Sequence, residues 1–377
     1  MPPLCLIFLI LYYRHGWRES VLANLSVRWL FFFAAALVLI GVIFSIHPLN
    51  SLLHAGMGVN KAYILPFIAM ECVKSGKQLR LLVWAFVFAC FWEGLDGLWQ
   101  IYTGRDFIMG YQPNAGRLTG SLGDYTVGNY LALAFVPACG VWFILREKMG
   151  RIAVAFIFCA VFWPAWILLV GASSRSSILA VAGAVFLWGL LSRGPRRAGT
   201  WLWPALILWL FSLCQPGRLD PAAVASDNRW DLWGLAWKVF MAHPFFGAGA
   251  GQYNAAFREM GLAPAREAIT ISHPHNLYLD ILCAHGLTGF FCAAVFIGGF
   301  LLWTLKRIYP RIKNGDEGGV YWALTAWFWL GFVAWLINGV FGHDFYRIWW
   351  LAEAMCALGV TIGAVSLDAT RAEKNEL

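Results

Sequence analysis

The sequence predicts an all-α polytopic membrane protein with about 11–12 transmembrane helices. Of its 377 residues, 60% are hydrophobic and only 13% are charged, and the mean hydropathy is +0.65. Soluble proteins carry roughly 25% charged residues, so this chain has too little charge to cover a globular surface. Its 22 Trp and 12 Tyr are typical of membrane interfaces, which satisfy both the apolar ring and its polar edge.

Eleven apolar segments predict the spans, and most are long enough to cross a hydrocarbon core of roughly 30 Å. They cover residues 3–13, 29–46, 55–70, 81–101, 125–145, 152–170, 176–192, 200–214, 287–305, 319–341 and 346–366, of which 3–13 and 200–214 are short. Most outer connections are short, but residues 215–286 form a long loop. We therefore expect N-terminal helices over residues 1–214, this loop with its short helices, and C-terminal helices with a tail over 287–377.

The net charge of +8 reflects topology, and no nucleic-acid partner is expected. Basic residues gather in every second connection, and the positive-inside rule makes those connections cytoplasmic. They hold 18 of the 28 basic residues, namely Arg14, Arg18, Arg28, Lys74, Lys77, Arg80, Arg146, Lys148, Arg151, Arg193, Arg196, Arg197, Lys306, Arg307, Arg311, Lys313, Arg371 and Lys374. The long loop then lies outside, as does Met1, a start that could mean an upstream helix is missing.

The nine cysteines lie almost entirely within the apolar segments. They form no C-x-x-C pair, and no Cys/His spacing resembles a zinc site. We therefore expect small core residues in these positions, with no structural metal, no metal in the site and no disulfide framework.

The long loop contains a predicted helix over residues 229–241, which ends at His243-Pro244. Its aromatic residues recur at spacings of three and four, the pattern of one apolar helical face lying in a membrane surface. That face comprises Trp230, Trp233, Trp237, Phe240 and Met241. The glycine-rich residues 247–251 then predict a tight backbone passage.

His275 is the first candidate for chemistry. Pro274 favours a helix that begins at His275, and Gly286 would break this helix before the next span. Such a half-helix is tolerated in a membrane protein where it lines a cavity. A neutral imidazole can accept a proton near neutral pH, and Asn276 beside it could orient a substrate. The alternative is a histidine that caps the helix or packs against aromatic rings, which we favour for His273.

Three arginines are candidates for binding an anionic substrate. Arg175 lies in a hinge of small and hydroxyl residues that includes Ser174, where a bulky anion could approach a guanidinium suited to phosphate oxygens. Arg229 begins the aromatic helix, and Arg117 borders a polar loop that could line a glycan groove. Each could instead be an interfacial residue that reaches toward the membrane surface.

Together these motifs resemble the O-antigen ligase and polymerase superfamily of bacterial envelope glycosyltransferases, over about residues 90–365. They are Ser174-Arg175-Ser176, Arg229 before an aromatic helix, His243-Pro244-Phe245-Phe246-Gly247-Ala248-Gly249, His275-Asn276-Leu277-Tyr278-Leu279 and Gly286-Leu287-Thr288-Gly289. The resemblance is closest to O-antigen ligase. It implies about twelve helices with both termini cytoplasmic, one more than we count here.

The resemblance also implies a function. Such enzymes sit in the bacterial inner membrane and transfer a glycan, at the periplasmic face, from an undecaprenyl diphosphate donor to an acceptor. They use no cofactor, nucleotide sugar or metal. For a ligase the acceptor is lipid A–core. By this likeness His275 would activate the acceptor hydroxyl, and Arg175 and Arg229 would hold the diphosphate. Ser174, Asn276, Arg117 and His273 are further candidates for substrate contact. Inversion at the anomeric carbon is expected.

Two alternatives stay open. A polysaccharide polymerase would share the donor and these motifs, and would differ in its acceptor. A transporter or flippase of lipid-linked oligosaccharide belongs to another class, and for it the carboxylates Glu93 and Asp96 within an apolar segment could mark an ion pathway. That class is typically built from two similar halves, and we detect no half-repeat in this sequence.

Overall fold

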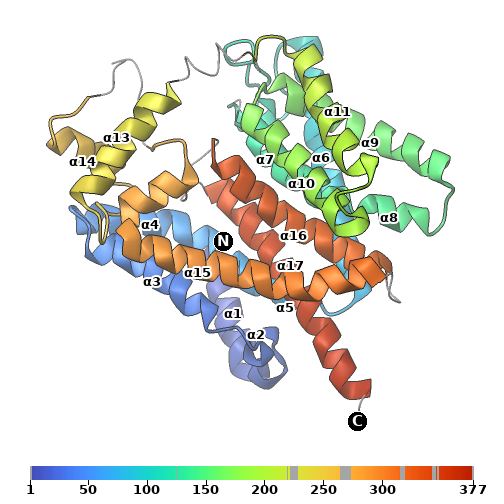
Figure 1. The fold of residues 1–377 in the computed structure, drawn as a ribbon, viewed down its shortest axis with the longest axis horizontal. Coiled ribbons are helices and arrows are strands. Elements are labelled where there is room, and N and C mark those ends of the chain that lie inside the picture. Colours follow the sequence, from blue (N-terminus) through green and yellow to red (C-terminus); the bar gives the residue numbers. More distant parts are fainter. Residues whose placement is uncertain are drawn as a thin grey trace. The chain divides into compact units, whose positions relative to one another are not determined.

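The structure is a computed structural model that describes residues 2–124, 126–218, 220, 228–263, 273–314, 319–341, 345 and 348–375. Its named elements are all helices (Figure 1). They are α1 (Pro2–Gly16), η1 (Trp17–Glu19), α2 (Val21–Asn24), α3 (Leu30–Ile43), α4 (Pro48–Ala62), α5 (Leu65–Cys72), α6 (Gly76–Thr103), η2 (Gly120–Leu122), α7 (Val127–Ala138), α8 (Val141–Arg146), α9 (Arg151–Gly171), α10 (Arg175–Arg193), α11 (Ala198–Cys214), α13 (Arg229–Ala242), α14 (Tyr253–Glu259), α15 (Leu277–Asn314), α16 (Gly319–Gly339) and α17 (Ile348–Asn375).

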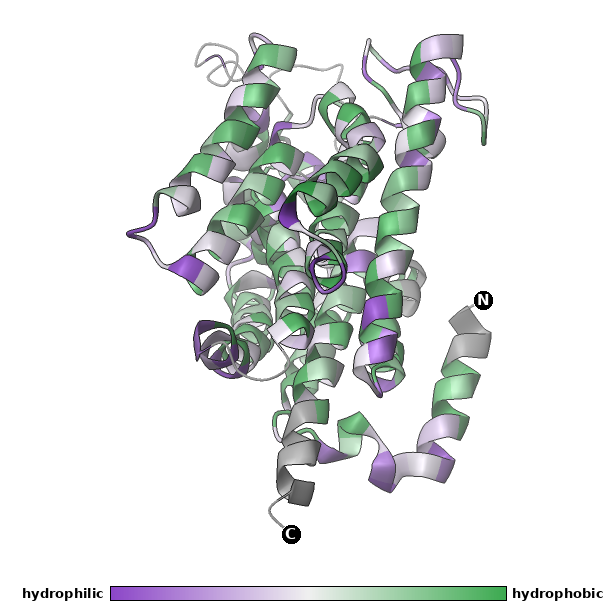
Figure 2. Ribbon diagram, turned by 90° about the vertical axis from the view of Figure 1, so that its right-hand side faces the viewer, coloured by the Kyte–Doolittle hydropathy of each residue, from purple (hydrophilic) through white to green (hydrophobic). Residues whose placement is uncertain are grey.

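Among the described residues, 7 helices are long and apolar enough to cross a membrane. They are α6, the run Val127–Arg146 that joins α7 and α8, α9, α10, α15, α16 and the segment Trp349–Leu367 of α17. In Figure 2 apolar residues follow the long helices, and hydrophilic residues gather near helix ends and connections. The prediction of an all-α polytopic membrane protein is therefore confirmed.

The other predicted spans are helical but do not meet this criterion. The 14 residues of α3 and the 17 residues of α11 are apolar but shorter. Residues 55–70 are divided between α4 and α5, since Pro66 near the start of α5 has no N–H for a continuous helix. Whether these segments and α1 cross the membrane stays a prediction.

Local sequence determines how α6 begins, ends and packs. The Ser75 hydroxyl accepts a hydrogen bond from the backbone N–H of Gln78 and so caps the first turn. Gly104, with φ 78°, ends the helix in the left-handed conformation that suits glycine. Gly94 lets α6 approach α9 closely, because a Cβ there would lie 2.3 Å from the backbone nitrogen of Ala165. Small residues allow such contacts between membrane helices.

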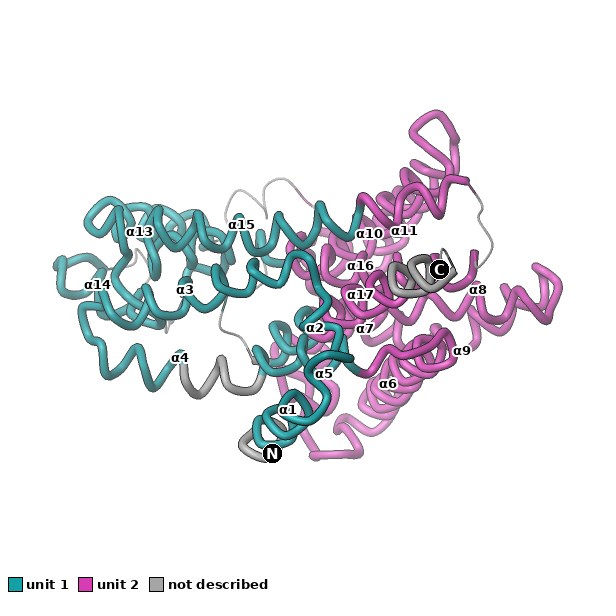
Figure 3. Tube along the Cα trace, turned by 90° about the horizontal axis from the view of Figure 1, so that it is seen from below, with its two compact units in different colours: residues 1–71, 226–305, 339–355 teal, residues 72–225, 306–338, 356–377 magenta. Residues whose placement is uncertain are grey.

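The chain forms two compact units, each of which combines distant parts of the sequence (Figure 3). Unit 1 holds residues 1–71, 226–305 and 339–355, and unit 2 holds residues 72–225, 306–338 and 356–377. The helices of the long loop belong to unit 1, and α6 to α11 belong to unit 2. The predicted division in sequence order, at 214 and 286, stays a prediction.

Helix α13 exists as predicted, and its buried residues overlap the predicted aromatic face only in part. Its buried residues pack against α14 and are Leu232, Leu235, Ala236, Val239 and Phe240. Of the predicted aromatic face, Trp230, Trp237 and Met241 are about half exposed, at 49%, 53% and 59%. The spacing located the helix correctly, but an apolar stripe does not tell whether it meets protein or lipid. The exposed aromatic residues suit the expected membrane surface, which stays a prediction.

Candidate functional site

Helix α15 is broken at Gly286, as the sequence predicted. Gly286 has φ 61° and ψ −164°, which separates a half-helix over residues 277–285 from the longer part of α15. This region of backbone space is essentially confined to glycine. A Cβ on Gly286 would also lie 2.4 Å from the carbonyl carbon of Phe245. The break therefore depends on glycine twice, through its conformation and through close backbone packing.

Residues 244–249 satisfy the backbone groups that the break leaves without helical partners. Buried N–H and C=O groups need such partners, and water cannot supply them in an apolar environment. Four hydrogen bonds do so, from Ala248 N to Cys283 O (2.7 Å), Gly249 N to Ala284 O (3.0 Å), Leu287 N to Pro244 O (2.8 Å) and Thr288 N to Phe245 O (3.0 Å). The His-Pro-x-x-Gly-x-Gly motif and the half-helix are thus two parts of one local structure.

The same segment is also fixed to the α3–α4 region. Ala250 donates its backbone N–H to the carbonyl of Gly41 at 2.8 Å, and the Ser51 hydroxyl donates to the carbonyl of Ala250 at 2.8 Å. Gly247, Gly249 and Gly251 have φ values of 74°, 111° and 70°. The predicted tight passage is confirmed, and it is hydrogen-bonded both to the half-helix and to the α3–α4 region.

His275 lies just before the half-helix, which corrects the prediction that the helix begins there. The helix begins at Leu277, because the Oδ1 of Asn276 accepts the N–H groups of Tyr278 and Leu279, both at 3.0 Å. This cap places Pro274 in the preceding turn. His275 takes a left-handed conformation, with φ 52°, which is uncommon for a residue other than glycine.

His273 supports this turn. Its Nδ1 accepts the backbone N–H of His275 at 3.2 Å, and the two imidazole rings lie 4.1 Å apart with an interplanar angle of 54°. His273 and Asn276 are buried, at 5% and 7% exposure, while His275 is half-buried. His273 and Asn276 therefore have structural roles in presenting His275. Their contacts with substrate stay predictions.

Arg229 is the other predicted site residue of unit 1. It is the first residue of α13 and is half-buried. The position matches the sequence prediction, in which a guanidinium stands at the start of the aromatic helix. Helix α13 is joined to the half-helix, since the Cys283 thiol donates to the carbonyl of Ala236 at 3.1 Å.

In unit 2, the hinge before α10 is organised by a buried amide that the sequence analysis missed. The Oδ1 of Asn129, on α7, accepts hydrogen bonds from Ser174 at 2.8 Å, Ser176 at 3.1 Å and Ser177 at 2.6 Å. Asn129 is 4% exposed. The Ser174 hydroxyl is thus engaged within the protein, and its contact with substrate stays a prediction.

Replacement of Asn129 is expected to destabilise unit 2. Asn129→Leu removes the acceptor of three hydroxyl groups, and buried groups without partners should lower the free energy of unfolding by about 2–4 kcal/mol. Thermal unfolding of the purified protein in detergent measures this loss. Ser192→Ala on α10 is the control, because that hydroxyl bonds only within its own helix, to Trp188 O. An unfolding midpoint of Asn129→Leu equal to that of Ser192→Ala would contradict the assigned role.

Arg175 begins α10 and lies beside a second arginine. Its Nη1 donates to the carbonyl of Arg218 at 3.5 Å, and the Nη2 of Arg218 donates to the carbonyl of Ser173 at 2.9 Å. Ser173 has φ 54°, so the hinge, like the turn at His275, contains a non-glycine residue in left-handed conformation. Arg218 was not among the predicted residues. It follows the turn at Gln215-Pro216-Gly217, which was the only sequence pattern that pointed to it.

Arg117 belongs to a loop that reaches the same hinge. The backbone N–H of Leu118 donates to the carbonyl of Gly171 at 3.1 Å. Gln100 on α6 holds this loop, since its Oε1 accepts the backbone N–H of Thr119 at 2.9 Å. Unit 2 therefore brings together the segments that carry Arg117, Arg175 and Arg218, and unit 1 brings together His273, His275 and Asn276.

Glu93 and Asp96 have structural partners in this loop region. Both oxygens of Glu93 accept the Ser121 hydroxyl, at 3.0 and 2.8 Å. The Oδ1 of Asp96 accepts the backbone N–H of Phe107 at 2.7 Å. Both carboxylates thus hold the loop, and the ion-pathway alternative stays a prediction.

Asp96→Asn is therefore expected to be tolerated. An amide oxygen can replace Oδ1, and Oδ2 is buried with no hydrogen-bond partner among the described residues. A neutral amide is less costly to bury than a carboxylate, so we expect a stability equal to wild type or about 1 kcal/mol greater. Asp106→Asn is the contrast, because both oxygens of Asp106 accept backbone N–H groups. Thermal unfolding compares the two, and loss of function in stable Asp96→Asn would support the ion-pathway alternative.

Residues 159–294 match the family model described as O-antigen ligase. This segment resembles an O-antigen ligase domain. The predicted resemblance is thereby confirmed, and the domain includes Arg175, Arg229 and His275. Over 260 residues the chain is 22% identical to the ComP-specific O-oligosaccharyltransferase of Acinetobacter baylyi, a match that covers 65% of this chain and 44% of that protein. The chain thus aligns with less than half of this relative's length.

The described part of the chain contains no group of three or more His, Cys, Asp or Glu side chains that could hold a metal ion. The basic residues of the two units, by contrast, provide cationic groups suited to phosphate oxygens. The expectation of a metal-independent reaction stays a prediction.

Proposed function

We propose that this protein is an O-antigen ligase-type glycosyltransferase. It moves a glycan from undecaprenyl diphosphate to a hydroxyl of lipid A–core at the periplasmic face of the bacterial inner membrane. The O-antigen ligase domain supports the reaction class. The topology predicted from the basic residues supports the location, because it places the long loop outside the cytoplasm.

The turn at His275 is the observation on which this proposal chiefly rests. A half-buried imidazole stands at the start of a half-helix, in a strained conformation maintained by His273, Asn276 and the Gly286 break. Strained residues held in place by their surroundings are typical of functional sites. A histidine that served only to cap the helix would not need this conformation, because Asn276 already provides the cap.

His275 would act as the general base. It removes the proton from the acceptor hydroxyl as the acceptor oxygen bonds to the anomeric carbon. The bond from that carbon to the diphosphate oxygen breaks, and undecaprenyl diphosphate leaves as the anion. Attack opposite the leaving group inverts the anomeric configuration. The leaving group is already activated, so the protein must position the hydroxyl and stabilise the charge of the diphosphate.

Arg175 and Arg229 are proposed to bind the diphosphate. Arg175 begins α10 in unit 2, and Arg229 begins α13 in unit 1. Arg175→Gln and Arg229→Gln should each lower kcat/KM for the donor by about 10²-fold, the usual loss when one donor to a developing charge is removed. The Lys variants should recover part of this loss, since the charge remains but the bidentate geometry does not. Exposed Arg105 and Arg258 are controls, one in each unit, and their Gln variants should keep normal rates. Equal rates for candidates and controls would reject the assignment.

A reconstituted transfer assay tests the function itself. Purified protein receives an undecaprenyl diphosphate-linked glycan, with lipid A–core or without added acceptor, in the presence of EDTA. We expect transfer only when lipid A–core is present as the acceptor. Chain lengthening without acceptor would show a polymerase instead, and activity that EDTA abolishes would show that a metal is required. The Acinetobacter baylyi relative is named for ComP, so ComP belongs in the assay as a third acceptor.

A further inference from the structure

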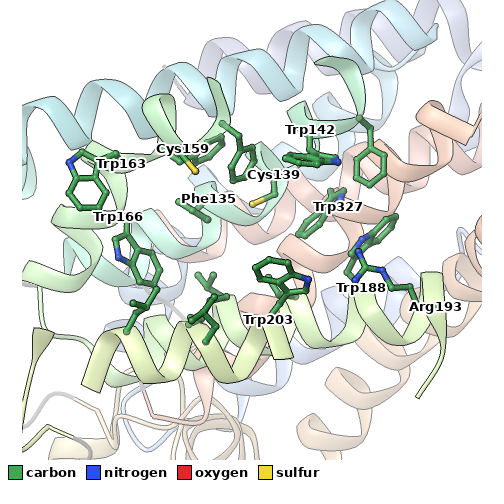
Figure 4. Close-up of a pocket in the computed structure, with 18 residues that line it drawn as sticks. Phe135, Cys139, Trp142, Cys159, Trp163, Trp166, Trp188, Arg193, Trp203 and Trp327 are labelled. Carbon is green, nitrogen blue, oxygen red and sulfur yellow. The ribbon is translucent and has the colours of Figure 1, made fainter. Parts of the chain in front are cut away.

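Unit 2 contains an apolar pocket of about 470 Å³ that none of the proposed site residues lines. Segments of α7, α8, α9, α10, α11 and α16 surround it, and all but α11 lie in the seven helices long enough to cross a membrane. Its most prominent lining residues are six tryptophans (Figure 4), namely Trp142, Trp163, Trp166, Trp188, Trp203 and Trp327.

The pocket has one charged lining residue, Arg193, at the C-terminal end of α10. Arg193 lies at one end of the pocket with Trp188 and Trp327, and Trp163 and Trp166 lie at the other end (Figure 4). The Trp188 and Trp327 rings are 5.4 Å apart. The lining is therefore amphipathic along its length, with a cationic end and an aromatic end.

Trp327 lines the cationic end of the pocket (Figure 4). It is 5% exposed, and its Nε1 is buried without a hydrogen-bond partner in the described part of the chain. Buried indole N–H groups normally find an acceptor. This N–H has almost no exposed surface, so Trp327 contributes its ring to the lining and its N–H stays enclosed by protein.

We propose that this pocket binds an acyl chain of an anionic phospholipid of the cytoplasmic leaflet. The lipid phosphate pairs with Arg193, and the acyl chain lies against the aromatic lining. The distribution of basic residues predicts that the Arg193 end is cytoplasmic, where Arg196 and Arg197 follow it. That leaflet carries the anionic lipids, and basic pockets between membrane helices on this side suit their head groups.

The glycan donor is a poorer fit to this pocket. Arg175, the proposed ligand of its diphosphate, is the first residue of the 19-residue helix α10, and Arg193 is the last. At about 1.5 Å per residue the two lie about 27 Å apart along that helix. A phosphate on Arg193 therefore belongs to a different molecule from a diphosphate on Arg175. The lipid-binding proposal does not depend on the proposed transfer reaction.

Native mass spectrometry of the purified full chain tests the proposal. The protein is incubated in mild detergent with equal amounts of phosphatidylglycerol and phosphatidylcholine, and the bound lipid is counted. Wild type should retain phosphatidylglycerol preferentially, and Arg193→Gln should lower its binding about fivefold, the factor expected for one arginine near an anionic membrane surface. Arg196→Gln is the matched control, because Arg196 is exposed in the same loop but does not line the pocket.

Two tryptophans on α11 test where the acyl chain of the lipid lies. Trp203 and Trp209 are similarly exposed, at 49% and 56%, but only Trp203 lines the pocket. Trp203→Ala should reduce retention of phosphatidylglycerol, and Trp209→Ala should not. Equal binding of the two lipids, equal effects of Arg193→Gln and Arg196→Gln, or displacement of bound phosphatidylglycerol by undecaprenyl phosphate would each overturn the proposal.

Discussion

His275→Asn is expected to slow glycan transfer severely and leave the protein folded. Positioned general bases contribute roughly 10²–10⁴-fold to a rate, so kcat should fall by about that factor. Asparagine is the informative replacement, because it tolerates the left-handed conformation that His275 adopts at φ 52°. Alanine at this position would add backbone strain to the loss of the imidazole. The initial rate in the reconstituted assay gives kcat, and thermal unfolding verifies the fold.

A second histidine supplies the control for this experiment. His15 is exposed at the end of α1, where its Nδ1 contacts only the carbonyl of Leu11, at 2.8 Å. His15→Asn should therefore keep the wild-type rate. Normal turnover of a folded His275→Asn protein would disprove the general-base mechanism. A loss of both activity and thermal stability would assign His275 a structural role.

The turn around His275 shows which structural features the sequence patterns could predict and which they could not. The motif order identified the half-helix and the glycine that breaks it, because glycine has few substitutes at such a break. Proline near a helix start and asparagine at the N-cap are both common. The prediction from Pro274 began the helix at His275, two residues before Leu277, where the asparagine cap begins it. The structure selects the asparagine cap. This choice decides whether His275 is part of the helix or is presented before it.

Contacts between distant segments were beyond the sequence patterns. Asn129 and Ser174 are 45 residues apart, and Arg218 and Ser173 are also 45 residues apart, without a periodicity that links them. The sequence also did not reveal which face of α13 packs against α14. Lipid and protein core both accept apolar side chains, so its aromatic stripe could not reveal which side would meet the protein.

Gly286→Ala is expected to be the most destabilising single substitution near the site. The backbone conformation of Gly286 costs other residues about 1–3 kcal/mol. In addition, the new Cβ would meet backbone atoms of Phe245 and Phe246 at 2.4–2.5 Å, and no side-chain rotation relieves a backbone overlap. We expect loss of more than about 3 kcal/mol of folding free energy, measured as a large fall in the thermal unfolding midpoint.

Gly298→Ala on the same helix is the matched control. Nothing lies within 4 Å of a Cβ at Gly298, and alanine is favoured over glycine in a helix by about 1 kcal/mol, so its unfolding midpoint should stay or rise. The comparison tests why the two motifs occur together. If Gly286→Ala were as stable as Gly298→Ala, residues 244–249 could not be the close partner of the break. The conformation presenting His275 would then need another support.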